Sequence, residues 1–269
     1  MTDKNAFLLI DKINKLLVKQ AVITKSTSRE DIKRFITKLH PFVFEKGLVR
    51  LGPNGDGGYL VPDDFDGIEG CFSPGVSCIS GFELDCAKLG MAIYMADKSV
   101  EKPNLDLPTE QYDFIKKYIG VVNNDDFITM DEWVNTSAVS KKSDLLLQMD
   151  IEGAEYASLL NTSTELLQRF RIMIIEFHYF KDLWNRRFFS QVEATFDKLL
   201  QTHSIVHIHP NNNFGIDRKL GIEIPRLAEF TFIRNDRANL REHQQYFPHS
   251  LDFDNTPAKS IVLPKQWYK

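Results

Sequence analysis

The chain has 269 residues, of which 43% are hydrophobic and 26% are charged, and its formal net charge is −4 at pH 7. This length and hydrophobic content suit one large α/β core and exclude a disordered or fibrous protein. Because the net charge is negative, there is no general basic surface, and we expect no nucleic acid partner.

The first predicted element is an amphipathic helix over residues 7–23. Apolar residues recur at helical spacing from Leu9 to Val22, while Asp11 and three lysines interrupt the apolar run. These charges, and the lack of a small-residue cleavage site, predict neither a signal peptide nor a transmembrane segment. The helix could pack on the domain, form a homodimer contact with a second subunit, or lie on a membrane surface; packing or a dimer contact is favoured.

From Ser28 onward, helix-like and strand-like patterns alternate. Helices are expected over residues 28–39, 80–89, 129–134, 155–159, 165–170 and 188–201. Strands are expected over residues 70–73, 92–95, 117–122, 144–149, 171–177, 204–209 and 228–233. This alternation predicts an α/β fold with a doubly wound, mostly parallel sheet.

We expect two regions along the chain. Residues 1–45 form an N-terminal helical extension, and residues 46–269 form the main domain. From Asn235 onward the chain is polar and contains several prolines, which favours a wrapping tail or lid over a second domain.

The cysteines indicate the compartment. Cys71, Cys78 and Cys86 show no CxxC spacing and no paired histidines. This pattern supports neither a disulfide framework nor a structural zinc site. We therefore expect a cytoplasmic protein.

The segment Leu51-Gly52-Pro53-Asn54-Gly55-Asp56-Gly57-Gly58-Tyr59 is rich in turn residues. An Asp-Gly turn between two extended segments is typical of a β-hairpin, which is the favoured interpretation. Alternatively, Asp56 and the backbone amides of Gly57 and Gly58 contact a ligand.

A glycine turn follows the expected strand at 70–73. Asp97 lies 22 residues beyond Gly75, close to the spacing of about 20 at which an acidic residue reaches a ribose hydroxyl. The full GxGxxG pattern is absent, since Ser77 stands where a second glycine is expected, and this favours a ligand without phosphate groups. The alternative is that Gly75 only makes a tight turn and Asp97 only caps a loop.

Polar side chains follow several of the expected strands. Asp150 ends the apolar run 145–149, Glu176 and His178 share one face of the next strand, and His209 ends a later one. If these strands are neighbours, the four side chains converge at the carboxyl edge of the sheet. Carboxylates with imidazole can bind a divalent cation or form a base with its orienting partner. The alternative is a set of buried, hydrogen-bonded polar residues.

Two groups of residues near this edge remain ambiguous. Glu152 and Glu155 could simply oppose a helix dipole. Five aromatic residues could stack on a sugar or pack in the interior, and packing is favoured: Tyr179, Phe180, Trp184, Phe188 and Phe189.

The segment Asp150-Ile151-Glu152-Gly153-Ala154-Glu155 resembles the D-[VI]-E-G-[AY]-E signature of FkbM-like S-adenosylmethionine-dependent methyltransferases. Similarity extends to Asp56-Gly57-Gly58-Tyr59, to Gly75-Val76-Ser77 with Phe82-Glu83, to Glu176-Phe177-His178, and to Phe247-Pro248-His249-Ser250-Leu251-Asp252. It covers most of the chain from about residue 48, and it departs from the family pattern at Ser77.

The resemblance implies a class I, Rossmann-like methyltransferase that uses S-adenosylmethionine to methylate a hydroxyl oxygen. In this family the acceptor is often a sugar of a polysaccharide or glycoconjugate, or a small natural product. The implied cofactor contacts are Asp56, Gly58, Gly75, Ser77, Glu83, Asp97 and Asp126. Among them, Gly75 and Ser77 line the methionine and ribose end, Asp97 holds the ribose hydroxyls, and Asp126 contacts the adenine.

A hydroxyl must lose its proton as it attacks the methyl group, so the site needs a base. We predict His178 or His209 as this base, with Asp150 as a further catalytic residue. A divalent cation such as magnesium could assist, bound by Asp150, Glu176 and His209. The alternatives are a metal-dependent hydrolase on the same type of sheet, or a non-catalytic binding module that docks through residues 7–23.

Overall fold

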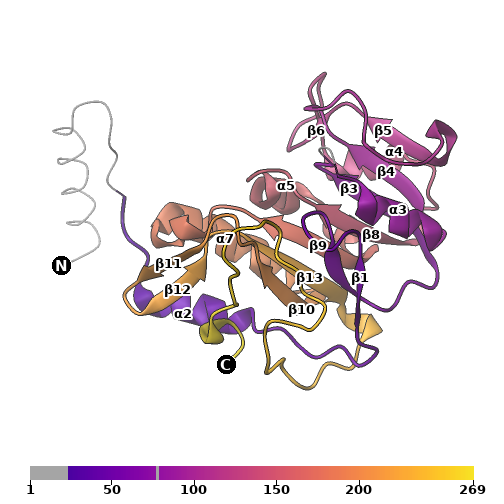
Figure 1. The fold of residues 1–269 in the computed structure, drawn as a ribbon. Helices are drawn as coiled ribbons and strands as arrows, with labels where there is room; N and C mark the ends of the chain where they lie inside the picture. The colour runs from indigo at the N-terminus through magenta and orange to yellow at the C-terminus, as the bar shows by residue number, and fades with distance from the viewer. Residues whose placement is uncertain (1–23, 77–78) are drawn as a thin grey trace.

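The computed structural model describes residues 24–76 and 79–269 (Figure 1). The predicted helix 7–23, Ser77 and Cys78 lie outside the described residues. A seven-stranded sheet with the order β10-β13-β9-β8-β3-β4-β5 forms the centre. Its strands are β3 (Ile68–Pro74), β4 (Ala92–Ala96), β5 (Tyr112–Ile115), β8 (Asp144–Met149), β9 (Phe170–Phe177), β10 (His203–Pro210) and β13 (Ala228–Arg234).

The sheet is mostly parallel, as the sequence predicts. The neighbours β5, β4, β3, β8 and β9 pair in parallel. Strand β13 is antiparallel to both β9 and β10. It lies between β9 and β10, so these two strands are not neighbours.

Four of the helices in the described residues begin after a capping side chain. The helices are α2 (Arg29–Lys38), α3 (Gly81–Lys88), α4 (Met130–Thr136), α5 (Glu155–Asn161), α6 (Thr164–Leu167) and α7 (Arg186–Leu199). Ser28, Thr129, Ser163 and Asn185 each accept a hydrogen bond from a backbone N–H in the first turn of the helix that follows. Such caps satisfy amides that have no partner within the helix.

Both faces of the central strands are covered, which explains their continuous apolar runs. On one face, Leu145 and Leu147 belong to a core that includes residues of α2, α5 and α7. On the other face, Leu146 packs in a second core with α3 and with the hairpin of β1 (Leu48–Leu51) and β2 (Tyr59–Pro62). The hairpin interpretation of the glycine-rich segment is thus confirmed, with Leu51 opposite Tyr59.

Two predicted elements are wrong in position. The strand expected at 117–122 is replaced at the sheet edge by β5, and only β6 (Tyr118–Ile119) is extended there, paired with β7 (Phe127–Ile128). The polar turn after Gly120 folds the chain back, since Gly120 N–H donates to the Ile128 carbonyl at 2.9 Å. Likewise α6 ends before Phe170, whose buried side chain begins β9.

The remaining elements are short. A small hairpin of β11 (Ile216–Lys219) and β12 (Ile222–Pro225) precedes β13, and the turns η1 (Thr109–Gln111), η2 (Phe180–Trp184), η3 (Asn235–Arg237) and η4 (Lys265–Trp267) are 3-10 helices.

The end of the chain packs on both faces of the sheet, since Leu240 contacts one core and Trp267 belongs to the other. Figure 1 shows the C-terminus beside α2, where η4 makes contact. Within residues 24–76 and 79–269, no helix is both long enough and apolar enough to cross a bilayer.

Candidate active site

The carboxyl ends of β3 and β8 meet at Gly75 and Asp150. Gly75 N–H donates to the Ala96 carbonyl at 3.0 Å, and Asp150 N–H donates to the Pro74 carbonyl at 3.2 Å. Gly75 has φ +87°, and a Cβ atom on it would lie 1.6 Å from the Asp150 carbonyl oxygen. Only glycine fits this junction, because the positive φ disfavours other residues and the Asp150 backbone leaves no room for a Cβ atom.

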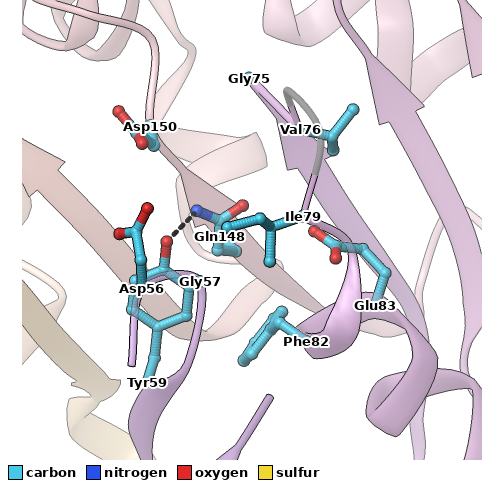
Figure 2. A pocket seen from close by; sticks show the side chains of 10 residues that line it. All are labelled: Asp56, Gly57, Tyr59, Gly75, Val76, Ile79, Phe82, Glu83, Gln148 and Asp150. Carbon is cyan, nitrogen blue, oxygen red and sulfur yellow. Dashed lines mark hydrogen bonds between the residues drawn. The ribbon is translucent and has the colours of Figure 1, made fainter. Parts of the chain in front are cut away.

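Two pockets adjoin this junction and share both residues. The first, here called the β4 pocket, measures about 430 Å³ and is lined by Gly75, Ala96, Asp97, Ser99, Tyr118, Ile119, Phe127, Asp150, Ile151, Glu152 and Ala154. The second, here called the hairpin pocket, measures about 100 Å³ and is lined by Asp56, Gly57, Tyr59, Gly75, Val76, Ile79, Phe82, Glu83, Gln148 and Asp150 (Figure 2). Together they suit one elongated ligand lying across the ends of β3 and β8.

The β4 pocket places Asp97 where the sequence suggests a ribose contact. Asp97 follows β4, and its Oδ1 accepts hydrogen bonds of 2.7 Å from the Ser99 backbone N–H and hydroxyl. Asp126, the suggested adenine contact, is not on the pocket wall. It forms an ion pair with Lys98, and its side chain is 57% exposed. The neighbouring Phe127, with Tyr118 and Ile119, forms an apolar wall instead.

The hairpin pocket is lined by carboxyl groups. Figure 2 shows Asp56, Asp150 and Glu83 around it, with Gln148 hydrogen-bonded to Tyr59. No lysine or arginine is among the described residues that line it. Gly58 is not among the residues that line this pocket, and only glycine fits there, because a Cβ atom would lie 2.0 Å from the Pro53 carbonyl oxygen.

Glu83 begins a chain of buried polar groups. The Ser73 hydroxyl lies 2.5 Å from Glu83 Oε1 and 2.7 Å from Gln148 Oε1. A hydroxyl carries one proton, so Ser73 can donate to only one of these two oxygens, and a neutral Glu83 that donates to Ser73 lets the hydroxyl donate to Gln148. Burial agrees, since it raises the pKa of Glu83 despite the opposing hydrogen bond with Ser73.

His178 lies beside Asp150 and is held by Glu155. The Glu155 side chain is fully buried, and its Oε1 lies 3.0 Å from His178 Nδ1. The same oxygen accepts the backbone N–H groups of Ile151 at 3.2 Å and Gly153 at 2.9 Å. Because Glu155 occupies Nδ1, the other ring nitrogen, Nε2, faces the site, 3.8 Å from Asp150 Oδ1.

The acidic surroundings shift the proton affinity of both groups. Burial opposes a charged imidazole, but the hydrogen bond with Glu155 and the neighbouring carboxylates outweigh it, so the pKa of His178 is raised. Burial, reinforced by nearby carboxylates against the attraction of His178, raises the pKa of Asp150 to about 7. Asp150 Oδ1 is buried and has no hydrogen-bond partner among the described residues. A strand-end carboxyl with such a pKa and an unpaired oxygen indicates a ligand contact.

The remaining predicted residues lie along the same edge but form a different arrangement. Glu229 of β13 stands directly between Glu176 and His209 in the strand register. Glu176 accepts a hydrogen bond from Asn211 at 3.2 Å, and burial with the nearby Asp150 carboxylate raises its pKa. His209 turns to the tail instead.

The suggested magnesium ligands are therefore not assembled. Asp150, Glu176 and His209 do not bring their ligand atoms within 4.8 Å of one another. In the described part of the chain, the groups that do so are Asp150 with Glu155 and His178, and His207 with His209 and Asp252. The inserted strand β13 is the physical reason, because it separates β9 from β10.

The aromatic residues after His178 divide into two groups. Phe180, Trp184 and Phe189 are buried in the core, which confirms the packing interpretation for them, and Phe188 packs partly buried against it. Tyr179 is exposed, has φ +64°, and lies with its ring centroid 6.0 Å from that of His178. Its ring covers Gly153, where a Cβ atom would lie 2.3 Å from Tyr179 Cε2.

Sequence reasoning missed or left open several residues of this region. The sequence left the roles of Glu155 and of the exposed Glu152 undecided. The position of Glu155 in the first turn of α5, close to the end of β8, was the feature that could have distinguished it. Glu229 could have been found from the sequence, because it is a charged residue within the otherwise mostly apolar strand β13. No local pattern indicates that Tyr118 and Phe127 form a pocket wall. They lie on two short strands, β6 and β7, whose pairing brings them together.

Comparison with known proteins finds a family match for the central part of the chain. Residues 99–214 match the family model of the methyltransferase FkbM domain. This range contains Asp126, Asp150, Glu176, His178 and His209, whereas Gly75 and Asp97 precede it. A search among curated proteins found no match. The family match agrees with the resemblance carried by the Asp150–Glu155 segment, and residues 99–214 are similar to the methyltransferase FkbM domain.

Proposed function

We propose that this protein transfers the methyl group of S-adenosylmethionine to a hydroxyl of a sugar, on a class I, doubly wound Rossmann-like fold. The observation that carries the proposal is the pair of pockets that share Gly75 and Asp150 beside His178. One pocket is partly apolar with an acid at a strand end, and the other is acidic. S-adenosylmethionine has matching parts, an adenosine and a positively charged sulfonium with its amino acid group.

In this proposal the adenosine portion of the cofactor lies in the β4 pocket and the methionine portion in the hairpin pocket. In the β4 pocket, Asp97 accepts hydrogen bonds from the ribose hydroxyls, while Tyr118 and Phe127 flank the adenine. The methionine portion extends to the hairpin pocket, where Asp56 and Asp150 oppose its positive charge. Backbone at Gly75 lies between the two portions, because no side chain blocks that position.

His178 is the base in this proposal. Its Nε2 takes the acceptor proton while the acceptor oxygen bonds to the methyl carbon and the carbon–sulfur bond breaks, which leaves a neutral thioether. Glu155 keeps Nδ1 protonated and stabilises the imidazolium that forms. The Tyr156 hydroxyl donates to the His178 carbonyl at 2.6 Å and fixes the backbone of the base.

The residues beyond His178 support a polyhydroxyl acceptor in a polysaccharide or glycoconjugate precursor. The exposed Tyr179 ring can stack on the apolar face of a sugar. Glu176 and Glu229, each held by an asparagine amide, supply acceptors for sugar hydroxyls. Since the Asp150–Glu176–His209 set is not assembled, the proposal assigns no step to magnesium.

Calorimetry tests the cofactor first. S-adenosylmethionine should bind the wild-type protein, Asp97→Asn should weaken binding at least about tenfold, and Asp113→Asn on the exposed edge of β5 should bind normally. No binding by the wild-type protein would overturn the proposal and favour a hydrolase or a binding module. With binding established, mass spectrometry of sugar acceptors should show a gain of one methyl group, lost in His178→Gln.

Two expectations stay predictions within this proposal. We expect the enzyme to act in the cytoplasm, where free thiols such as Cys71 and Cys86 remain reduced. We also expect residues 7–23 to contribute to a homodimer, which light scattering on the full chain can test at several concentrations.

A further inference from the structure

A second group of potential ligands lies outside the two pockets, where the tail crosses β10. His207 and His209 occupy one face of β10, and Asp252 comes from the tail. His207 Nε2 lies 2.9 Å and His209 Nδ1 lies 3.5 Å from the same oxygen, Asp252 Oδ1. We call these three residues the tail cluster.

The spacing of the tail cluster suits a metal ion. In a tetrahedral zinc site, bonds of about 2.0–2.1 Å place neighbouring ligand atoms roughly 3.3 Å apart. The distances from Asp252 Oδ1 to His207 Nε2 (2.9 Å) and to His209 Nδ1 (3.5 Å) lie on either side of this value. The side chains of His207, Asp252 and His209 are only 3%, 7% and 11% exposed, so the ligands are held within the fold.

Outer hydrogen bonds also orient the ligands. Asn255 Oδ1 lies 3.2 Å from His209 Nε2, the nitrogen that points away from Asp252. The second oxygen of Asp252 accepts the His249 backbone N–H at 2.8 Å. Partners of this kind fix the tautomer of a ligating histidine and the direction of a ligating carboxylate. Asn255 also donates to Glu229 at 2.7 Å, which orients the Asn255 amide.

We propose that His207 Nε2, His209 Nδ1 and Asp252 Oδ1 bind one divalent transition metal ion of the zinc type, with water as the fourth ligand. Two imidazoles and one carboxylate match the preference of such ions. The ion joins the tail to β10 and so fixes Asn255 beside Glu229. This site is independent of the proposed methyl transfer and shares no ligand with the other group, in which Glu155 Oε1 is already occupied by two backbone amides and His178.

Cobalt binding tests the proposal on the full chain. Metal-free protein should take up one Co²⁺ per chain, with the strong visible absorption of a tetrahedral ion, and Zn²⁺ should displace it. Stoichiometric uptake should disappear in Asp252→Asn and in His207→Gln. It should persist in His243→Gln, a matched histidine variant elsewhere on the tail, and in Glu155→Gln of the other group.

A variant of an outer partner gives a graded result. Asn255→Ala keeps all three ligands, and its affinity for Zn²⁺ should fall about 10–100-fold in calorimetry. Circular dichroism confirms that each variant folds; if one ligand variant does not, the other and Asn255→Ala decide. The proposal is overturned if metal-free wild-type protein binds neither ion stoichiometrically, which would leave a hydrogen-bonded triad. Binding that survives in Asp252→Asn or is lost only in Glu155→Gln would overturn it as well.

Discussion

Gly75 touches the backbone of Asp150 so closely that these two residues join the ends of β3 and β8 into one site. A Cβ atom on residue 75 would lie 1.6 Å from the Asp150 carbonyl oxygen. Both pockets depend on this contact, because both include the two residues.

Gly75→Ala should therefore destabilise the protein and abolish cofactor binding. Gly90 is a matched control, since its φ of +89° is nearly the same as that of Gly75 (+87°), but nothing lies within 4 Å of its added Cβ. Gly90→Ala should lower the free energy of unfolding by about 1–2 kcal/mol, the cost of the left-handed conformation. Gly75→Ala should cost clearly more in denaturant titrations. Equal losses in the two variants would show that the contact with Asp150 is unimportant.

Glu155→Gln should slow catalysis without weakening cofactor binding. Glutamine can still accept from His178 Nδ1 and the backbone amides, but it no longer stabilises the charged imidazole. We expect kcat to fall at least about tenfold, within the usual contribution of a positioned base. Because the raised pKa of His178 depends partly on Glu155, the acid limb of the pH–rate profile should move to lower pH.

An NMR titration of the His178 ring compares the pKa of His178 in wild type and in Glu155→Gln, and it needs no methyl acceptor. Glu165→Gln, in the exposed first turn of α6, is the control. A His178 pKa that is equal in wild type and Glu155→Gln would contradict the positioning role.

Cofactor binding should release protons through Asp150. The pKa of Asp150 is raised to about 7, chiefly by burial, and a nearby sulfonium favours the ionised carboxylate. Release should be greatest just below about pH 7. It should vanish at higher pH, where Asp150 is already ionised, and also below the lowered pKa of the complex, where Asp150 is protonated in both states. Calorimetry in buffers of different ionisation enthalpy measures it. S-adenosylhomocysteine, which lacks the sulfonium charge, and the Asp150→Asn variant should both release fewer protons; equal release in all cases would exclude this contact.

Asp64 should contribute to stability through its basic neighbours. Its side chain is 4% exposed and pairs with Lys46 at 2.6 Å and Arg237 at 2.8 Å, with Arg171 at 3.7 Å. Although burial opposes its ionisation, these groups lower its pKa from 3.8 to about 2. The shift corresponds to about 2 kcal/mol at neutral pH.

A lowered carboxyl pKa stabilises the fold above the unfolded value and loses this effect as pH falls through the folded value. Asp64→Asn should thus be at least about 2 kcal/mol less stable than wild type at pH 7, with the difference shrinking between about pH 4 and 2. Asp63→Asn, on the exposed neighbour, should change little. Unfolding curves across pH make the measurement, and a constant difference would contradict the role of this charge.

Much of the fold could be predicted from local patterns. The apolar runs around Leu146 and Ile174 are buried on both faces, which is why they appear in the sequence as continuous strands. The turn at Gly52–Gly58 and the caps at Ser28 and Thr129 act within a few residues, so their effects are visible without the tertiary structure.

The site was predicted only in part, because local patterns do not tell which strands are neighbours. Gly75, Asp97 and Asp150 each follow a strand, and a parallel sheet brings such ends together. His209 also follows a strand, but β13 separates it from the strand of His178. Periodicity tells which face of a strand a residue occupies and not which strand lies beside it.

By itself, then, the sequence determined most element types, the mostly parallel sheet and the strand-end residues of a chain with similarity to the methyltransferase FkbM domain, because these follow from short-range periodicity and a local motif. Only the tertiary structure decided that Glu155 orients His178, that Tyr118 and Phe127 wall the β4 pocket, and that Asp252 meets His207 and His209. The last contact joins residues 45 positions apart in the chain. Such contacts arise when whole elements bury their apolar faces together, and no local pattern records them.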